Sequence, residues 1–221
     1  MARIIDKDEK RANIALSAIK LFCEKGIQQT SIDEIAKSAE VAKGTIYLYF
    51  KNKEEIVFTI WDILSAQHQE TFQKNITVNM SAKEKILEYF NFNQLQEEFD
   101  KEQILKLFQH FISSMLIDET QLYTAYFESF FKKDYDFIFL YLNEGIDKGE
   151  LIIDDVDNLT NIIILLLKGL LVKSKASNMT FNETQNILNK HLSYLLDNYT
   201  KDKLWINQNY LIKWVNILKE L

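Results

Sequence analysis

Hydrophobic residues recur every three or four positions along most of the chain, the spacing that places them on one face of an α-helix. The first such stretch covers residues 8–25 and ends at Lys25-Gly26, where glycine can take the left-handed conformation that often follows a helix. The strict alternation of apolar and polar residues that is typical of strands is missing. The pattern predicts an all-α fold.

Polar capping residues indicate where further helices begin. In the segment "TSIDE", either Thr30 with Asp33 or Ser31 with Glu34 can form a capping box before a second helix. A short helix is expected over about 42–49, and a long one begins at Asn52. Later helices are expected at about 81–96, 101–116, 119–148, 157–176, 181–199 and 204–220. We expect a break in the third of these near Phe131–Asp134, and a turn at Leu151–Asp157.

Composition supports the helical prediction. The chain has 221 residues, no proline and five glycines, and these two residue types are the main helix breakers. Its one cysteine, Cys23, is typical of a protein in a reducing compartment and is expected to be a buried apolar residue. The start lacks the apolar stretch of a secretory signal, and the apolar run Ile162–Val172 is shorter than the roughly 20 residues of a membrane span. We therefore expect a cytoplasmic protein with no membrane partner.

Charge is distributed unevenly along the chain. Residues 1–53 hold 10 Lys/Arg and 7 Asp/Glu, a balance of +3, whereas residues 54–221 hold 16 and 25, a balance of −9. The asymmetry indicates a small basic head, residues 1–52, on a larger acidic body, residues 53–221. The formal net charge of −6 argues against a protein that coats nucleic acid without regard to sequence.

Two helices joined by a tight connection over about residues 31–50 have the layout of a helix-turn-helix, supported by the helix before them. In such a unit the second helix enters the major groove of DNA. There Lys43 can donate to guanine, Thr45 can contact a base or a phosphate, and Gly44 lets the backbone approach. Ile46 and Phe50 are expected to face inward. The predicted DNA-binding residues are Thr30, Ser31, Ala42, Lys43, Gly44, Thr45, Tyr47, Tyr49, Lys51 and Lys53.

The tyrosine hydroxyls would serve phosphates, and Lys53 would add its charge at the start of the next helix. Spacing alone also fits an amphipathic helical hairpin with surface lysines. The segment "TSIDEIAKSAEVAKGTIYLYFKNKEEI" resembles the N-terminal signature of the TetR/AcrR family of bacterial transcriptional regulators, in the Thr start, Ile-Ala, Gly-Thr, Tyr-x-Tyr-Phe and Lys-Glu. Ala42 stands where the family often carries serine, which removes one hydroxyl.

The resemblance implies a homodimer in which the last two main helices of each subunit form a four-helix bundle. The sequence agrees, because Ile162–Val172 is too uniformly apolar for a surface helix and Gly169 permits close helix approach. Packing inside one subunit is the alternative for both helices. The predicted interface residues are Ile163, Leu166, Gly169, Leu170, Leu188, Leu192 and Leu195.

The resemblance also implies a ligand pocket in the body. Between the head and the dimer helices lies "YTAYFESFFKKDYDFIFLYL", in which nine of twenty residues are Phe or Tyr. These rings either line a pocket for an apolar or aromatic effector or only pack the core, and His110 is either a ligand contact or a buried structural histidine. The candidate ligand-binding residues are Trp61, His110, Tyr123, Tyr126, Phe127 and Phe130.

No cofactor or metal is expected, since His68 and His191 are isolated and no Cys/His cluster has metal-ligand spacing. An enzyme is not expected either, because the chain lacks a nucleophile elbow and a glycine-rich phosphate loop. The sequence thus predicts a ligand-responsive homodimeric repressor that binds a palindromic double-stranded operator. A nucleoid-type DNA-binding protein without effector control is the alternative. The segment 204–220 is expected to pack on the body or across the dimer.

Overall fold

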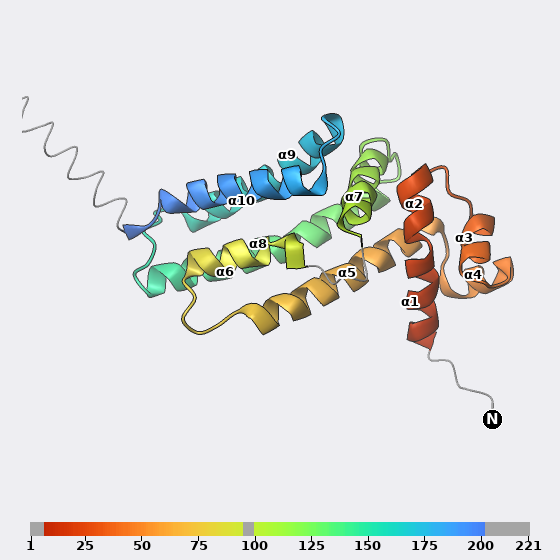
Figure 1. Ribbon diagram of the computed structural model, residues 1–221, viewed down its shortest axis with the longest axis horizontal. Coiled ribbons are helices and arrows are strands. Elements are labelled where there is room, and N and C mark those ends of the chain that lie inside the picture. Colours follow the sequence, from red (N-terminus) through yellow and green to blue (C-terminus); the bar gives the residue numbers. More distant parts are fainter. Residues whose placement is uncertain (1–6, 95–99, 202–221) are drawn as a thin grey trace, which may run out of the picture.

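The computed structural model describes residues 7–94 and 100–201, which form an α-helical protein (Figure 1). The helices are α1 (Lys7–Ser17), α2 (Ile19–Lys25), α3 (Ile32–Ser38), α4 (Lys43–Tyr49), α5 (Lys53–Asn75), α6 (Ala82–Tyr89), the 3-10 helix η1 (Phe92–Gln94), α7 (Lys101–Leu116), α8 (Leu122–Asp147), α9 (Val156–Ala176) and α10 (Phe181–Asp197). Apart from an isolated bridge between Leu151 and Thr200, this part of the chain contains no β-structure. The all-α prediction is confirmed.

Helices α1 to α4 gather at one end of the molecule, and α5 leads from them into the body (Figure 1). In the body, α6, α8, α9 and α10 run roughly along the long axis, while α7 lies next to α2. Because α5 packs against both α1 and α6, it joins the head to the body as one continuous helix. The division of the chain at residue 52 stays a prediction.

The apolar residues of the head pack in the same continuous core as those of the body. Ile46 and Phe50 are buried, as the helical spacing predicted, and they pack in one core with Ile14 and Phe22. Arg11 lies over the ring of Phe50, 4.2 Å from its centroid, and its guanidinium donates to the Tyr49 carbonyl and the Thr59 hydroxyl. Arg11 therefore fastens α1 to the end of α4 and the start of α5.

The prediction of one helix over residues 8–25 is wrong, because α1 ends at Ser17 and α2 begins at Ile19. At the junction the Ala18 amide donates to the Ala15 carbonyl, three residues back, at 3.1 Å. The Ser38 hydroxyl donates to the Ser17 carbonyl at 2.8 Å. A side chain that inserts into the backbone hydrogen bonds of a helix is a common cause of a helix break.

Helix α8 is continuous, so the predicted break near Phe131–Asp134 is also wrong. Neither proline nor glycine occurs in that stretch. Phe131 packs in the core, and Asp134, which can compete for backbone hydrogen bonds in a helix, instead accepts one from the hydroxyl of Tyr89. Because its carboxylate is bound to Tyr89, Asp134 does not disturb the backbone hydrogen bonds of α8.

Helix α6 ends at Tyr89, before the predicted residue 96. The cause is a long-range contact from α10: Gln185 donates to the carbonyl of Phe90 at 2.8 Å and accepts from the amide of Phe92 at 3.2 Å. These backbone groups are thus held outside a helix. The predicted turn at Leu151–Asp157 is confirmed over residues 151–155, but its last two residues already belong to α9, which Asp155 caps.

The predicted helix 204–220 lies outside the described residues. Within residues 7–94 and 100–201, no helix combines the length and the apolar character needed to cross a membrane.

Candidate nucleic-acid interface and effector cavity

Helix α4 presents a polar face to solvent. Ala42, Lys43 and Gly44 are exposed at its start, Thr45 is half-buried, and Tyr47 is 54% exposed. Apart from its chain neighbours and the backbone of its own helix, nothing lies within 4 Å of the place where a Cβ on Gly44 would stand, so this stretch of backbone is open to approach. The buried Ile46 and the ring of Phe50 fix the orientation of the opposite face. The arrangement fits a recognition helix whose first turn reaches base edges.

Lys43 is held beside α3 by Asp33, with 2.9 Å between its Nζ and Oδ1 of the carboxylate. The hydrogen bond to Asp33 raises the pKa of Lys43, so the ammonium stays charged at any physiological pH. Both side chains are more than half exposed. Such a surface ion pair is weak, and a guanine or phosphate acceptor can replace the carboxylate at little cost.

Lys53, at the first position of α5, is engaged by the backbone before α3. Its Nζ donates to the carbonyl of Gln28 at 2.7 Å and to that of Thr30 at 3.4 Å. Lys51 is exposed, and its amide donates to Glu55 at 3.0 Å. Lys51 is therefore the freer of the two lysines to reach a phosphate.

Thr30 is placed differently from the prediction. Its side chain is 1% exposed, and its hydroxyl donates to the carbonyl of Gly26 at 2.9 Å. The prediction of a DNA-binding side chain at Thr30 is wrong because the hydroxyl serves the loop before α3. The capping box of α3 is formed by Ser31 and Glu34, which resolves the two alternatives. Tyr49 is half-buried and packs against the core, so it is less available than Tyr47.

Leu48 is a residue that the sequence analysis overlooked. Its side chain is 76% exposed on α4, next to Tyr47. The signal was present in the spacing, because the inward positions 46 and 50 leave position 48 on the outer side of the helix. An apolar side chain there can contact the methyl group of thymine in the major groove.

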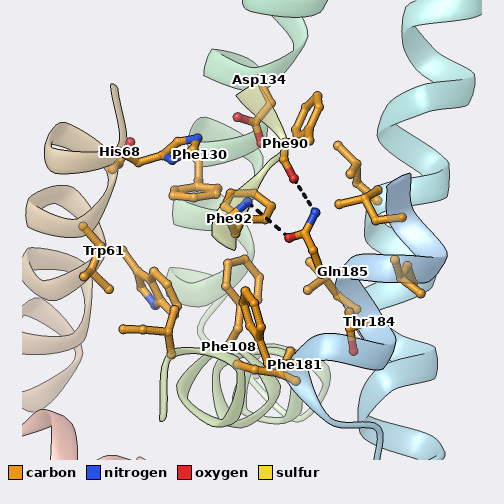
Figure 2. A pocket seen from close by; sticks show the side chains of 18 of the residues that line it. Trp61, His68, Phe90, Phe92, Phe108, Phe130, Asp134, Phe181, Thr184 and Gln185 are labelled. Atoms are coloured by element: carbon orange, nitrogen blue, oxygen red, sulfur yellow. Dashed lines mark hydrogen bonds between the residues drawn. The ribbon is translucent and has the colours of Figure 1, made fainter. Parts of the chain in front are cut away.

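A cavity of about 150 Å³ lies in the body, between α5, the end of α6, α7, α8, α9 and α10. Aromatic rings form much of its wall (Figure 2). Those labelled are Trp61, Phe90, Phe92, Phe108, Phe130 and Phe181. Trp61 and Phe130 were candidate ligand contacts from the sequence, and the structure brings both to this cavity.

The other four candidates do not line the cavity. Tyr123 and Phe127 are buried against Phe111 in the core. The hydroxyl of Tyr126 lies 3.0 Å from Asp62 and 3.1 Å from the Phe58 carbonyl. His110 lies beside Gly26 at the contact between α7 and the head. These assignments are corrected, because one face of the aromatic stretch packs the core and only part of it reaches the cavity.

A few polar groups interrupt the apolar wall: Asp134 and His68 lie at one end, and Thr184 and Gln185 lie on α10 (Figure 2). The hydroxyl of Tyr89 donates to Asp134 at 2.8 Å, and Nε2 of His68 lies 2.7 Å from the Tyr89 carbonyl. Burial raises the pKa of Asp134 to about 7, and burial lowers the pKa of His68. The indole N–H of Trp61 is buried without a hydrogen-bond partner in the described chain. An apolar cavity with a few polar groups is typical of a small-molecule site.

The described residues contain no group of three or more His, Cys, Asp or Glu side chains that could hold a metal ion.

The predicted dimer helices expose an apolar face, but with different residues from those predicted. Ile163, Leu170, Leu188 and Leu192 are buried in the core of their own subunit, so their assignment to the interface is wrong. Leu166 and Leu195 are half-buried and Gly169 is exposed. The exposed apolar residues of α9 and α10 are Ile162, Leu165, Val172 and Tyr194. Both sides of α9 are apolar, and the subunit core takes the side with Ile163 and Leu170.

Comparison with known proteins identifies the N-terminal part of the chain. Residues 14–60 match the family model described as bacterial regulatory proteins, tetR family. Over 80 residues, the chain is 40% identical to the fatty acid metabolism regulator protein of Bacillus subtilis. The matched region is 36% of this chain and 41% of that protein. It is 27% identical over 188 residues to the transcriptional regulator QacR of Staphylococcus aureus, covering 83% of this chain and 95% of QacR.

Solved structures extend the similarity to the whole fold. The transcriptional regulator FadR of Bacillus subtilis, in complex with stearoyl-CoA, has a TM-score of 0.62 at 25% identity, covering 83% of this chain and 96% of FadR. A TetR transcription regulator from Haloarcula marismortui has a TM-score of 0.72 at 14% identity, covering 88% of this chain and all of that one. Residues 14–60 thus have the helix-turn-helix region of bacterial regulatory proteins of the tetR family, and the described chain shares the overall fold of the solved regulators named here.

Proposed function

We propose that this protein is a ligand-responsive transcriptional repressor. It binds a palindromic operator as a homodimer through α4 of each subunit and is released when a small effector occupies the cavity in the body. The observation that carries the proposal is the outer face of α4, where Lys43 and Tyr47 are exposed on a helix anchored by the buried Ile46.

Two kinds of contact are offered to DNA. Lys43 and Leu48 lie where they can reach base edges, an ammonium for guanine and an apolar side chain for thymine. Tyr47 and Lys51 supply a hydroxyl and a charge for phosphates, contacts that hold the helix in register without reading sequence. A net acidic protein with these few local contacts is better suited to sequence-specific regulation than to binding DNA without regard to sequence.

A dimer is supported by the outer face of α9 and α10. Ile162, Leu165, Gly169 and Val172 follow one another at three- and four-residue steps, so they form one stripe along α9. Apart from its chain neighbours and the backbone of α9, nothing lies within 4 Å of a Cβ built on Gly169, so a second helix has room to approach there. Two-fold pairing through this stripe would supply the two α4 helices that a palindromic operator needs, with half-sites about 34 Å apart or more.

Helix α5 connects the two sites. It begins at Lys53, beside the DNA-binding residues, and carries Trp61, Leu64 and His68 to the cavity wall. An effector that moves this wall changes the direction of α5 and hence the spacing of the two heads. A coupling of about 1–3 kcal/mol between effector and operator, roughly 5–150-fold in affinity, is sufficient for regulation.

The proposal is tested by selecting DNA from a random pool with the purified full chain. Enrichment of one palindromic sequence is expected, with the dimer bound to it. Recovery of DNA without a common sequence would support a nucleoid-type protein instead and overturn the repressor.

A further inference from the structure

We propose that the effector is a small lipophilic monocation, an apolar or aromatic body with one positive charge, and that Asp134 is its counter-ion. This inference rests on the proposed function, because it names the effector class of the same cavity. It begins from the charges that line that cavity.

Asp134 is the one carboxylate in the described cavity wall, which contains neither lysine nor arginine. His68 and Tyr89 are the other titratable groups at that end: burial lowers the pKa of His68 and raises the pKa of Tyr89, so both are neutral at physiological pH. The Tyr89 carbonyl can only accept, so Nε2 of His68 is the donor in their contact and Nδ1 is left as an acceptor. This end of the cavity is therefore rich in acceptors and poor in cations.

Asp134 has only one polar partner in the described chain, the hydroxyl of Tyr89. Its neighbour Lys133 is exposed and forms no salt bridge with it, and the charge of Lys133 lowers the pKa of Asp134 by less than burial raises it. Asp134 is half-buried, and removing a carboxylate from water without a paired cation is costly, so the pKa of Asp134 is raised. A ligand that brings a positive charge to this carboxylate removes the cost, whereas an anionic ligand increases it.

The aromatic rings around Asp134 suit the same ligand. Figure 2 shows His68, Phe90 and Phe130 at the end of the cavity where Asp134 lies. The π-faces of Trp, Tyr and Phe attract cations, most strongly where water is excluded. This protein already uses one of the wall rings in this way, because Nζ of Lys168 lies 5.2 Å from the centroid of Phe131.

The size of the cavity limits the body of the ligand. An engineered apolar cavity of about 150 Å³ binds benzene, so the volume found here accommodates a single ring or a compact ammonium group without rearrangement. A phosphate or carboxylate head would find no lysine or arginine among the described wall residues. The site thus favours a cationic head over an anionic one.

Three probes of similar shape test the charge preference. Benzyltrimethylammonium carries a permanent positive charge, neopentylbenzene is its neutral carbon isostere, and phenylacetate carries a negative charge. Their dissociation constants are measured by equilibrium dialysis at pH 8, where Asp134 is mainly ionised, on wild type, Asp134→Asn, Asp134→Glu and Asp136→Asn. Asp136 is exposed on the same helix and pairs with Lys132, so it is the matched control.

Wild type is expected to bind the cation about tenfold or more tightly than the neutral isostere, and phenylacetate most weakly. Asp134→Asn should remove this preference with little change for the neutral probe. Asp134→Glu should keep the preference, and Asp136→Asn should match wild type. Equal affinities of wild type for cation and isostere, tighter binding of phenylacetate, no binding of any probe, or an unchanged preference in Asp134→Asn would each overturn the inference.

Operator binding in the same preparations separates this inference from the proposed function. If the selected operator is bound but the cation is not preferred, the effector class alone is wrong. If no DNA sequence is selected, the repressor is wrong, whatever the probes show. Thermal unfolding of each variant establishes that the chain is folded in every comparison.

Discussion

Asp134 affects the stability of the protein as well as its ligand preference. A carboxyl group with a pKa of about 7 in the native state, against about 3.9 unfolded, binds more protons when the protein is folded. Its contribution to stability is therefore greatest below pH 4 and is lost as the pH rises towards 7. Asparagine cannot ionise, so Asp134→Asn should be about 2 to 4 kcal/mol more stable than wild type at pH 8 and nearly equal at pH 4.

Urea unfolding from pH 4 to 8, at one protein concentration, measures the difference between the two proteins. Titration of His68 and other groups affects both, so only the difference reports on Asp134. A difference that stays constant over this range would contradict the raised pKa.

Single residues on α4 should divide into those that read sequence and those that hold DNA. Lys43→Ala removes a donor to a base and is expected to lower discrimination between operator and unrelated DNA by about 1–3 kcal/mol. Tyr47→Phe removes only a hydroxyl and should weaken binding to both DNAs alike. Gel-shift titrations with operator and with unrelated DNA give, for each variant, the ratio of its two affinities. Wild-type binding by both variants would refute this assignment.

The contact between α2 and α7 restricts which residues can replace Gly26. This residue has φ +82° and ψ 160°, a region that only glycine occupies readily, and a methyl group on it would lie 3.1 Å from Nδ1 of His110. Gly149 also has a positive φ, +68°, but nothing lies within 4 Å of its added Cβ. Gly26→Ala should therefore cost more unfolding free energy than Gly149→Ala, by about 1 kcal/mol or more.

Urea denaturation of both variants, and of each combined with His110→Ala, checks the cause. Removing the imidazole should recover part of the loss in Gly26→Ala and none in Gly149→Ala. Equal costs for the two glycines would show that His110 does not restrict Gly26.

The elements of this chain were predictable to different degrees. Ser31, Asn52 and Thr180 each cap the helix that follows them, because a side-chain oxygen next to free amide groups acts over only three residues. The ends of α1 and α6 were predicted wrongly, since contacts from Ser38 and Gln185 determine them. Those partners lie 21 and 95 residues away, beyond the reach of any local pattern.

For the molecule as a whole, the proposed repressor requires pairing through the outer stripe of α9 for tight DNA binding. Leu165 is 67% exposed in the middle of that stripe, so Leu165→Glu places a charge in the proposed interface and should shift the protein to monomers. A monomer reads one half-site, and operator affinity should fall by about 100-fold or more. Val78→Glu, at a 93% exposed loop position between α5 and α6, is the control.

Sedimentation velocity gives the oligomeric state, and a gel shift with the full operator gives the affinity. A Leu165→Glu variant that remains dimeric would place the interface elsewhere on the molecule.

Local patterns in the sequence were enough to predict the all-α class, most helix starts and the layout of the head, including the inward positions of Ile46 and Phe50. Periodicity and capping carry this information because they depend on neighbours within a few residues. Long-range packing was needed to establish that α9 turns Ile163 inward and Leu165 outward, and that Trp61, Asp134 and Gln185 meet around one cavity. Both sides of α9 are apolar, and helices distant in the sequence compete to cover them, so burial follows from packing and not from spacing.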